Sequence, residues 1–274
     1  MEYLNDPYPW TEGRDRALTM VDLVLNGTIP AEPAALLWWA LERGASLLTA
    51  GGPSGAGKST LADACLAFLP AGARAYAVAG RADPLQVPAD DGPTYLLIAE
   101  LSRHGRPYYL SGQAARRAFA LARAGRRVVG TLHADSVAEA VDNLGDEVEL
   151  APEDIARVDL VAIVRAAGGA TRGGHVRRDD TSVRRRVVEI GLLGPDPDRG
   201  VRHVTLADWD AGSGRLEFAA PPAGLAALGR WAGVPTATAE AAVAARADAL
   251  AGLAAEGRRD PRDVAEAVRR LRAT

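Results

Sequence analysis

The octapeptide at positions 52–59, Gly-Pro-Ser-Gly-Ala-Gly-Lys-Ser, fits the pattern G-x-x-x-x-G-K-[ST] and restricts the fold more than any other segment. Glycines allow successive backbone N–H groups to turn inward around an anion without Cβ clashes. An apolar run typical of a buried strand precedes the loop at 46–52, and a helical pattern follows it at 59–69. The motif therefore predicts a strand–loop–helix unit that holds phosphates at the helix N-terminus.

The residues of this loop have expected roles. The ammonium group of Lys58 would reach the β- and γ-phosphates, and the Ser59 hydroxyl would ligate Mg²⁺. The residues expected to contact the nucleotide are Gly52, Pro53, Ser54, Gly55, Ala56, Gly57, Lys58, Ser59 and Thr60. Lysine and arginine together number 32, and Lys58 is the single lysine. Arginine fills every other basic position. The two residue types differ most where a compact ammonium group must fit a confined anion-binding site. A lysine at this one position therefore favours phosphate binding over a glycine-rich turn with an incidental lysine.

The composition excludes fibrous, disordered and disulfide-stapled proteins. The 274 residues are 48% hydrophobic and 24% charged, with a net charge of −3. This charge gives no reason to expect nucleic acid as a partner, and the single cysteine, Cys65, excludes a Cys-built metal site. The most apolar stretch, 34–50, is interrupted by charged residues and is shorter than the ~20 residues of a membrane-spanning helix. We expect a cytoplasmic protein.

Strand and helix patterns alternate along most of the chain. Expected strands cover 46–52, 75–80, 94–101 and 127–134, with two more within 158–193, and expected helices cover 31–43, 59–69, 112–124 and 136–144. After Pro221-Pro222 only helices are expected, at 223–232, 237–256 and 261–272. This order predicts an α/β fold with a mostly parallel sheet flanked by helices and a small all-helical C-terminal tail. We divide the chain into a lead-in and helix (1–45), the domain with the loop (46–220) and the tail (221–274).

A second motif, Thr-Leu-His-Ala-Asp-Ser at 131–136, follows an expected strand. It opens a helix capped by Ser136, with Glu139 at the capping-box position. Ligands collect where the strands of a parallel sheet end. At such an edge His133 can sense a γ-phosphate or hold the attacking water, although a purely structural role is the alternative for a histidine at a strand end.

Together the two motifs resemble the type II/type IV secretion ATPase superfamily, which drives pili, archaella and secretion machines. Members carry a phosphate loop, an acidic box, a Walker B strand and a histidine box, T-[LI]-H-[AT]-x-S, which matches 131–136. Segments 18–52 and 158–193 and the helical end resemble the archaeal-type branch, so the resemblance spans 18–272. It implies a P-loop NTPase (RecA-like) fold, ATP and Mg²⁺ as ligands, and hexameric rings. It also implies a membrane-embedded secretion or pilus platform as partner, with the protein at the inner face of the membrane.

The chain departs from the family pattern in three places. It begins almost at the ATPase domain, without the usual N-terminal domain, so we expect weak self-association. Only Asp83 stands where the acidic box has several carboxylates. The Walker B region is either 94–100, which ends in Glu100, or 107–112, which places Tyr109 where glutamate belongs. We favour Glu100 as water activator and Mg²⁺ ligand because burying an unused carboxylate is costly, with a solvent-facing glutamate as the alternative.

We therefore predict an ATPase that couples hydrolysis to conformational work, with Glu100 and His133 as catalytic residues. If Tyr109 occupies the Walker B position, the alternative is a nucleotide-binding regulatory or accessory protein that has lost turnover. Tyrosine cannot activate water at neutral pH or hold Mg²⁺ as a carboxylate does. A nucleotide or small-molecule kinase is a weaker option, since nothing in the sequence resembles an acceptor site or lid.

Other side chains have a structural and a functional interpretation. An arginine group with two aspartates is best explained as a solvated hairpin, and an arginine that reaches a neighbouring subunit's nucleotide is the alternative. This group contains Arg177, Arg178, Asp179, Asp180, Arg184, Arg185 and Arg186. Trp38 and Trp39 fit core packing better than base stacking. The scattered histidines His104, His175 and His203 lack metal-ligand spacing.

Overall fold

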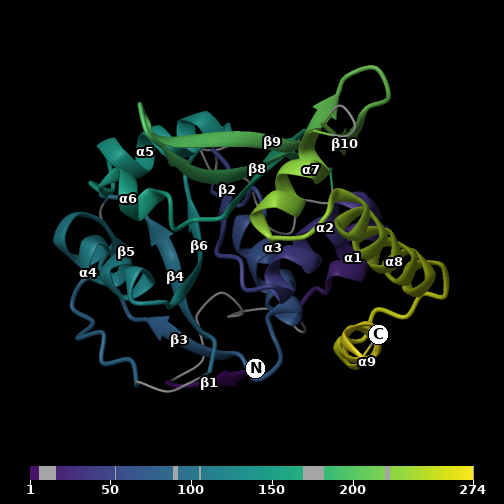
Figure 1. Cartoon of the computed structure of the whole chain (residues 1–274), viewed down its shortest axis with the longest axis horizontal. Helices are drawn as coiled ribbons and strands as arrows, with labels where there is room; N and C mark the ends of the chain where they lie inside the picture. The colour runs from purple at the N-terminus through teal and green to yellow at the C-terminus, as the bar shows by residue number, and fades with distance from the viewer. Residues whose placement is uncertain are drawn as a thin grey trace.

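A mixed sheet forms the centre of the computed structural model of this chain (Figure 1). The structure describes residues 1–5, 17–52, 54–88, 92–104, 106–168, 182–219 and 223–273. Within these residues the strands lie in the order β1 (Glu2–Tyr3), β3 (Arg74–Val78), β4 (Thr94–Leu101), β6 (Arg127–Leu132), β2 (Leu47–Ala50), β7 (Leu160–Ala167), β8 (Arg184–Asp196), β9 (Gly200–Asp210) and β10 (Arg215–Phe218). A short strand, β5 (Tyr109–Leu110), pairs with β4. The pairs from β1 to β7 are parallel and those from β7 to β10 are antiparallel, which confirms the predicted mostly parallel α/β fold.

Helices cover both faces of this sheet (Figure 1). One face carries α1 (Met20–Leu25), α2 (Ala31–Glu42), α3 (Lys58–Cys65), α7 (Ala223–Trp231), α8 (Thr236–Ala255) and α9 (Pro261–Arg272). The other carries α4 (Gly112–Arg123), α5 (Val137–Asp146) and α6 (Pro152–Ile155). Consecutive side chains of β2 alternate between the two cores, with Leu47 in the first and Leu48 in the second. Strands buried on both faces have continuous apolar sequences, which is why the sequence located them.

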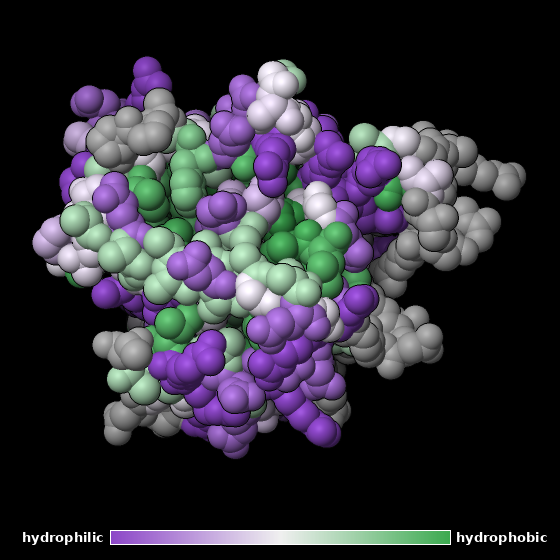
Figure 2. All heavy atoms as spheres, turned by 90° about the vertical axis from the view of Figure 1, so that its right-hand side faces the viewer, coloured by the Kyte–Doolittle hydropathy of each residue, from purple (hydrophilic) through white to green (hydrophobic). Residues whose placement is uncertain are grey.

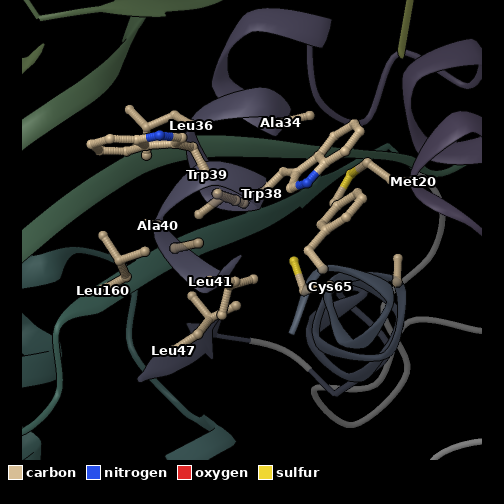
Figure 3. Close-up of a cluster of buried hydrophobic side chains, with 14 of the residues drawn as sticks. Met20, Ala34, Leu36, Trp38, Trp39, Ala40, Leu41, Leu47, Cys65 and Leu160 are labelled. Carbon is tan, nitrogen blue, oxygen red and sulfur yellow. The ribbon is translucent and has the colours of Figure 1, made fainter. Parts of the chain in front are cut away.

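The two tryptophans of α2 lie in the core (Figure 3). Trp38 is fully buried and stacks on Phe68, with ring centroids 4.8 Å apart and an interplanar angle of 4°. Trp39 is 2% exposed, and the guanidinium of Arg43 lies 4.7 Å from its ring centroid. The prediction that these two side chains serve packing is confirmed.

A charged cluster connects the C-terminal helices to α2. The carboxylate of Glu42 accepts hydrogen bonds from Arg246 on α8, at 2.7 and 3.0 Å, and from Arg272 on α9, at 2.9 Å. All three side chains are largely shielded from solvent. The helical tail is therefore held against the same core as the sheet.

The sequence patterns did not indicate β9 and β10. Many side chains of β9 are half-buried or exposed, so no apolar run marks this strand. The signal that could have located it is a pair of Asp- and Gly-containing turns, at 196–200 and 210–215. These strands extend the sheet on the antiparallel side, away from β4 and β6.

No helix in the described part of the chain is long and apolar enough to span a bilayer. Figure 2 views the molecule from the side of α8 and α9 and shows a band of weakly hydrophobic residues bordered by hydrophilic ones. On this side of the molecule α8 has an alanine-rich sequence. Its larger apolar side chains, Val243, Leu250 and Leu253, face the core.

Candidate functional site

The phosphate-loop motif connects β2 to α3 at the carboxyl edge of the sheet. The strand ends at Ala50, and the helix begins at Lys58 with Gly57 as its N-cap. Gly57 has φ of +109°, a conformation that favours glycine. At Gly51 the backbone approaches the Val164 carbonyl so closely that a Cβ would collide with it. Glycine is therefore required by close approach at one end of the loop and by backbone conformation at the other.

Lys58 is buried within its own loop, with only 6% of its surface exposed. Its Nζ donates a hydrogen bond to Gly51 O at 3.1 Å. Burial lowers the pKa of Lys58 below its usual value of 10.5, and the nearby carboxylates of Glu100 and Asp135 oppose this shift. The ammonium is thus poorly solvated, a state in which it gains most from a bound anion.

Ser59 and Thr60 occupy the first turn of α3, the part of a helix whose backbone N–H groups point toward a bound anion. Both residues are half-buried, Ala56 is buried, and Ser54 is exposed. Pro53 lies outside the described residues. The described residues contain no group of three or more His, Cys, Asp or Glu side chains arranged to hold a metal ion by themselves.

Glu100 lies at the end of β4 and is 7% exposed. Its Oε2 accepts a hydrogen bond from the Thr131 hydroxyl at 2.7 Å, and that hydroxyl also lies 2.6 Å from Ala99 O. Within the described part of the chain, Glu100 Oε1 is buried without a hydrogen-bond partner. A buried oxygen of this kind needs a ligand. Its position and chemistry fit a water molecule or an oxygen-coordinated cation such as Mg²⁺.

His133 follows β6 and connects Glu100 to the phosphate loop. Its Nδ1 lies 2.7 Å from Gly52 O, and its Nε2 lies 3.7 Å from Glu100 Oε1. A carbonyl oxygen only accepts hydrogen bonds, so this contact requires a proton on Nδ1. The ring is therefore oriented with Nε2 toward Glu100.

Asp135 is a further member of the site that the sequence did not single out. Its Oδ1 accepts a hydrogen bond from Gly52 N at 3.1 Å, and its own N–H donates to Glu139 at 2.7 Å. Glu139 therefore contacts Asp135 N, while Ser136 caps α5 by accepting from Glu139 N. The second motif touches the phosphate loop through both His133 and Asp135.

A cavity of about 280 Å³ opens beside these contacts, between the end of β4 and α5. One face of α5 contributes Glu139 and Asn143, and the C-cap residue Glu147 continues this spacing of four residues. The remaining lining residues are Gly52, Leu101, Ser102, His104, His133, Ala134 and Val148. The cavity continues the site away from the loop, and His104 Nε2 lies 3.8 Å from Glu147 Oε2 on its wall.

The two candidates for the Walker B residue are neighbours in the sheet, since Glu100 of β4 is paired with Tyr109 of β5. The residue that contacts Thr131 and His133 is Glu100. Asp83, the single carboxylate of the acidic-box region, is 4% exposed and accepts hydrogen bonds from Tyr76 OH, Ala79 N and Leu85 N. These bonds hold the loop after β3.

The arginine group reaches the phosphate loop within one chain. Arg185 on β8 donates from Nε to Gly55 O at 2.9 Å, and Arg186 lies over the ring of Trp209 at 5.0 Å. On β7, Arg165 donates to Asp135 O at 3.1 Å. The sequence did not single out Arg165, and it offered Arg185 only as a member of the arginine group, with a neighbouring subunit's nucleotide as the alternative target. Arg177, Arg178, Asp179, Asp180 and His175 lie outside the described residues.

No protein-family model matches this sequence, and no curated protein does. Among solved structures, the chain is similar to the VirB11 ATPase of the Brucella suis type IV secretion system, in complex with sulphate, at 19% identity and a TM-score of 0.39. It is also similar to the ATPase DotB of Legionella pneumophila (14%, 0.37) and of Yersinia pseudotuberculosis (12%, 0.36). The matches cover 65%, 59% and 67% of this chain and 57%, 49% and 50% of those chains. The chain thus spans about half the length of these structures, and its function is inferred from its own site residues.

Proposed function

We propose that this chain binds ATP with Mg²⁺ and hydrolyses it. The observation that carries this proposal is the buried, unpartnered Oε1 of Glu100, which lies 3.7 Å from His133 Nε2. His133 in turn contacts Gly52 of the phosphate loop and lies beside Lys58. A solvent-facing glutamate would explain neither the burial nor these contacts.

Each residue then has a physical task. Lys58 and the first N–H groups of α3 bind the phosphates. Glu100 accepts a proton from the attacking water, Thr131 holds the carboxylate in place, and His133 orients the water or contacts the γ-phosphate. Mg²⁺, when bound at Ser59 and Glu100, neutralises charge on the phosphate oxygens. Catalysis of this kind depends on positioning and charge stabilisation rather than on covalent chemistry.

We further propose that the energy of hydrolysis drives conformational work on a type II/type IV secretion or pilus machine. The support is the order of a phosphate loop and a T-L-H-A-x-S histidine box along one chain. We infer a cytoplasmic protein that acts at a membrane-embedded platform, with no role for nucleic acid. Assembly would be a hexameric ring that associates weakly when purified.

The assembly proposal predicts a concentration dependence. An arginine supplied by a neighbour is worth about 10³–10⁵ in the rate of phosphoryl transfer. We therefore expect slow turnover at low micromolar concentration and a rate that rises more than linearly with protein concentration. Light scattering alongside a concentration series of phosphate-release rates measures this. A stable hexamer with concentration-independent turnover would contradict weak association.

The hydrolysis proposal is tested with two substitutions at paired sheet positions. Glu100→Gln should retain MgATP binding and lose about 10²–10⁴-fold in turnover, the usual contribution of a general base. Tyr109→Phe is the matched control and should leave turnover unchanged. Wild-type protein that binds MgATP but shows no turnover in any assembly state would instead support the regulatory, hydrolysis-deficient alternative.

A further inference from the structure

We propose that Arg185 is a positioning residue for the phosphate loop, supplied by the same chain from β8. This inference rests on the proposed function, since it concerns how the loop is held ready for a phosphate. The observation that carries it is the hydrogen bond from Arg185 Nε to Gly55 O, 2.9 Å long. Gly55 is an interior residue of the loop, and Arg185 is 130 positions away from it in the sequence.

The aliphatic part of the same side chain covers another loop residue. A Cβ placed on Gly57 would lie 3.4 Å from Arg185 Cδ and 3.6 Å from Val164 Cγ1. The loop is therefore held at Gly55 by a hydrogen bond, and the side chains of Arg185 and Val164 flank it at Gly57. Both supports come from the β7–β8 hairpin.

A β-bulge aims Arg185 at the loop. On β8, Ile190 and Leu192 face the core that contains α3, whereas Leu193 faces the other core. The pairing of β7 with β8 shifts register between Ile163 and Val164, so that Val188 is the additional residue. Beyond it the alternation is reversed, and Val187 faces the α3 side.

Arg185 follows the same reversed alternation and lies opposite Ala166. Without the extra residue it would point to the opposite face of the sheet, away from the phosphate loop. Bulges of this kind often redirect a side chain next to an active site. The bulge thus explains how one arginine of a charged run reaches the loop.

The hydrogen bond sets the orientation of one peptide group. In a trans peptide the C=O and the following N–H point in opposite directions. When Arg185 holds Gly55 O, the N–H of Ala56 lies in the same peptide plane and points in the opposite direction, away from Arg185. A charged donor also polarises the peptide group it binds and strengthens the N–H as a donor. Arg185 therefore prepares a backbone donor for a phosphate without touching the phosphate itself.

Three variants separate this mechanism from a general contribution of charge or packing. Arg185→Met keeps the aliphatic chain and removes the donor. Arg185→Gln places an uncharged N–H donor the same number of bonds from the backbone as Nε. Arg184→Met is the matched control, because Arg184 is an exposed neighbour on the same strand with its side chain on the other face.

The experiment measures affinity for MgATP and for inorganic tripolyphosphate by isothermal titration, together with the melting temperature. We expect Arg185→Met to weaken both ligands by about ten- to hundredfold, the effect of losing a charge-assisted hydrogen bond. Arg185→Gln should lose less than about tenfold, and Arg184→Met should match wild type. Equal losses of affinity for the two ligands would place the effect at the phosphates rather than at the base. In the hydrolysis reaction, KM should rise more than kcat falls.

Several outcomes overturn the inference. Wild-type affinity in Arg185→Met would contradict it. Equal losses of affinity in Arg185→Met and Arg185→Gln would also contradict it, because the charge and not the hydrogen bond would then be responsible. If Arg185→Met does not fold, wild-type affinity in a folded Arg185→Ala variant would have the same meaning. A failure of the proposed function is distinguishable, since Lys58→Ala would then also bind both ligands like wild type.

Discussion

The ammonium nitrogen of Lys58 lies 3.4 Å from Nδ1 of His133, and the two side chains contact consecutive carbonyls of the phosphate loop, Gly51 O and Gly52 O. The two residues are 75 positions apart in the sequence. They meet because β2 and β6 are adjacent parallel strands whose carboxyl ends lie at the same edge of the sheet. The two motifs therefore form one site.

Removal of the lysine should abolish measurable MgATP affinity. In Lys58→Ala the phosphates lose their principal positive charge. The free energy of unfolding should change by less than about 1 kcal/mol, because relief of the desolvation cost of the buried ammonium offsets the lost hydrogen bond to Gly51 O. Isothermal titration and urea denaturation measure the two quantities. Arg103→Ala, at an exposed position, is the control. Unchanged affinity in Lys58→Ala would contradict the assignment of the loop.

The lowered pKa of Lys58 predicts a pH dependence of binding and of stability. Between that lowered pKa and 10.5 the folded protein releases the proton while the unfolded chain keeps it. MgATP affinity should therefore fall as pH rises through this window. The contribution of Lys58 to the free energy of unfolding should rise over the same window, since the unfolded state binds more protons. Lys58→Arg, which stays protonated, should show neither change. A wild-type profile that stays flat up to pH 10.5 would refute the prediction.

Thr131 should act on turnover through Glu100. In Thr131→Val the carboxylate loses the donor on Oε2, and a small displacement of a catalytic group can cost about 10²-fold in rate. We expect kcat to fall by about ten- to hundredfold with KM nearly unchanged, and Thr131→Ser to recover most of the loss. Steady-state phosphate release measures both constants. Full kcat in Thr131→Val would show that Glu100 needs no such support.

Asp135 places a negative charge against the loop that receives the phosphates. Asp135→Asn keeps an oxygen acceptor for Gly52 N–H and removes that charge, so MgATP should bind about three- to tenfold more tightly at low salt. The gain should shrink at high ionic strength because the contact is exposed to solvent. Asp142→Asn, at an exposed position on α5, controls for net charge. Weaker binding in Asp135→Asn would mean that the carboxylate is needed for the loop conformation.

The cluster at Glu42 should contribute strongly to stability. Glu42→Gln leaves the guanidinium groups of Arg246 and Arg272 without their shared counter-charge in a largely shielded position. Breaking a buried ion pair on one side costs about 3–5 kcal/mol, and we expect the lower end of that range. Urea denaturation monitored by tryptophan fluorescence measures it, with Glu240→Gln on the exposed side of α8 as control. A loss below 1 kcal/mol would show that α8 and α9 are held by apolar packing alone.

The sequence by itself determined the elements around the site. The glycine-rich motif follows an apolar run and precedes a helical pattern, so its place between a strand and a helix could be predicted. The central strands were predictable because parallel strands buried on both faces carry uninterrupted apolar runs. The histidine box was predictable as a strand end for the same reason. The β9–β10 hairpin lacks this signal, since its side chains face both core and solvent.

Only the tertiary structure decided which distant residues meet. Glu100 and Tyr109 both end short apolar segments, and the neighbour of β6 turns out to be the strand that carries Glu100. The role of Arg185 depends on a one-residue bulge that reverses the alternation of β8. Asp83 holds the loop after β3 because the tertiary structure brings hydrogen-bond donors from Tyr76, Ala79 and Leu85 to its carboxylate. Strand order and register are set by packing over the whole sheet. A shift of one residue in register moves a side chain to the opposite face of the sheet. Local sequence patterns therefore do not encode which of these distant residues come into contact.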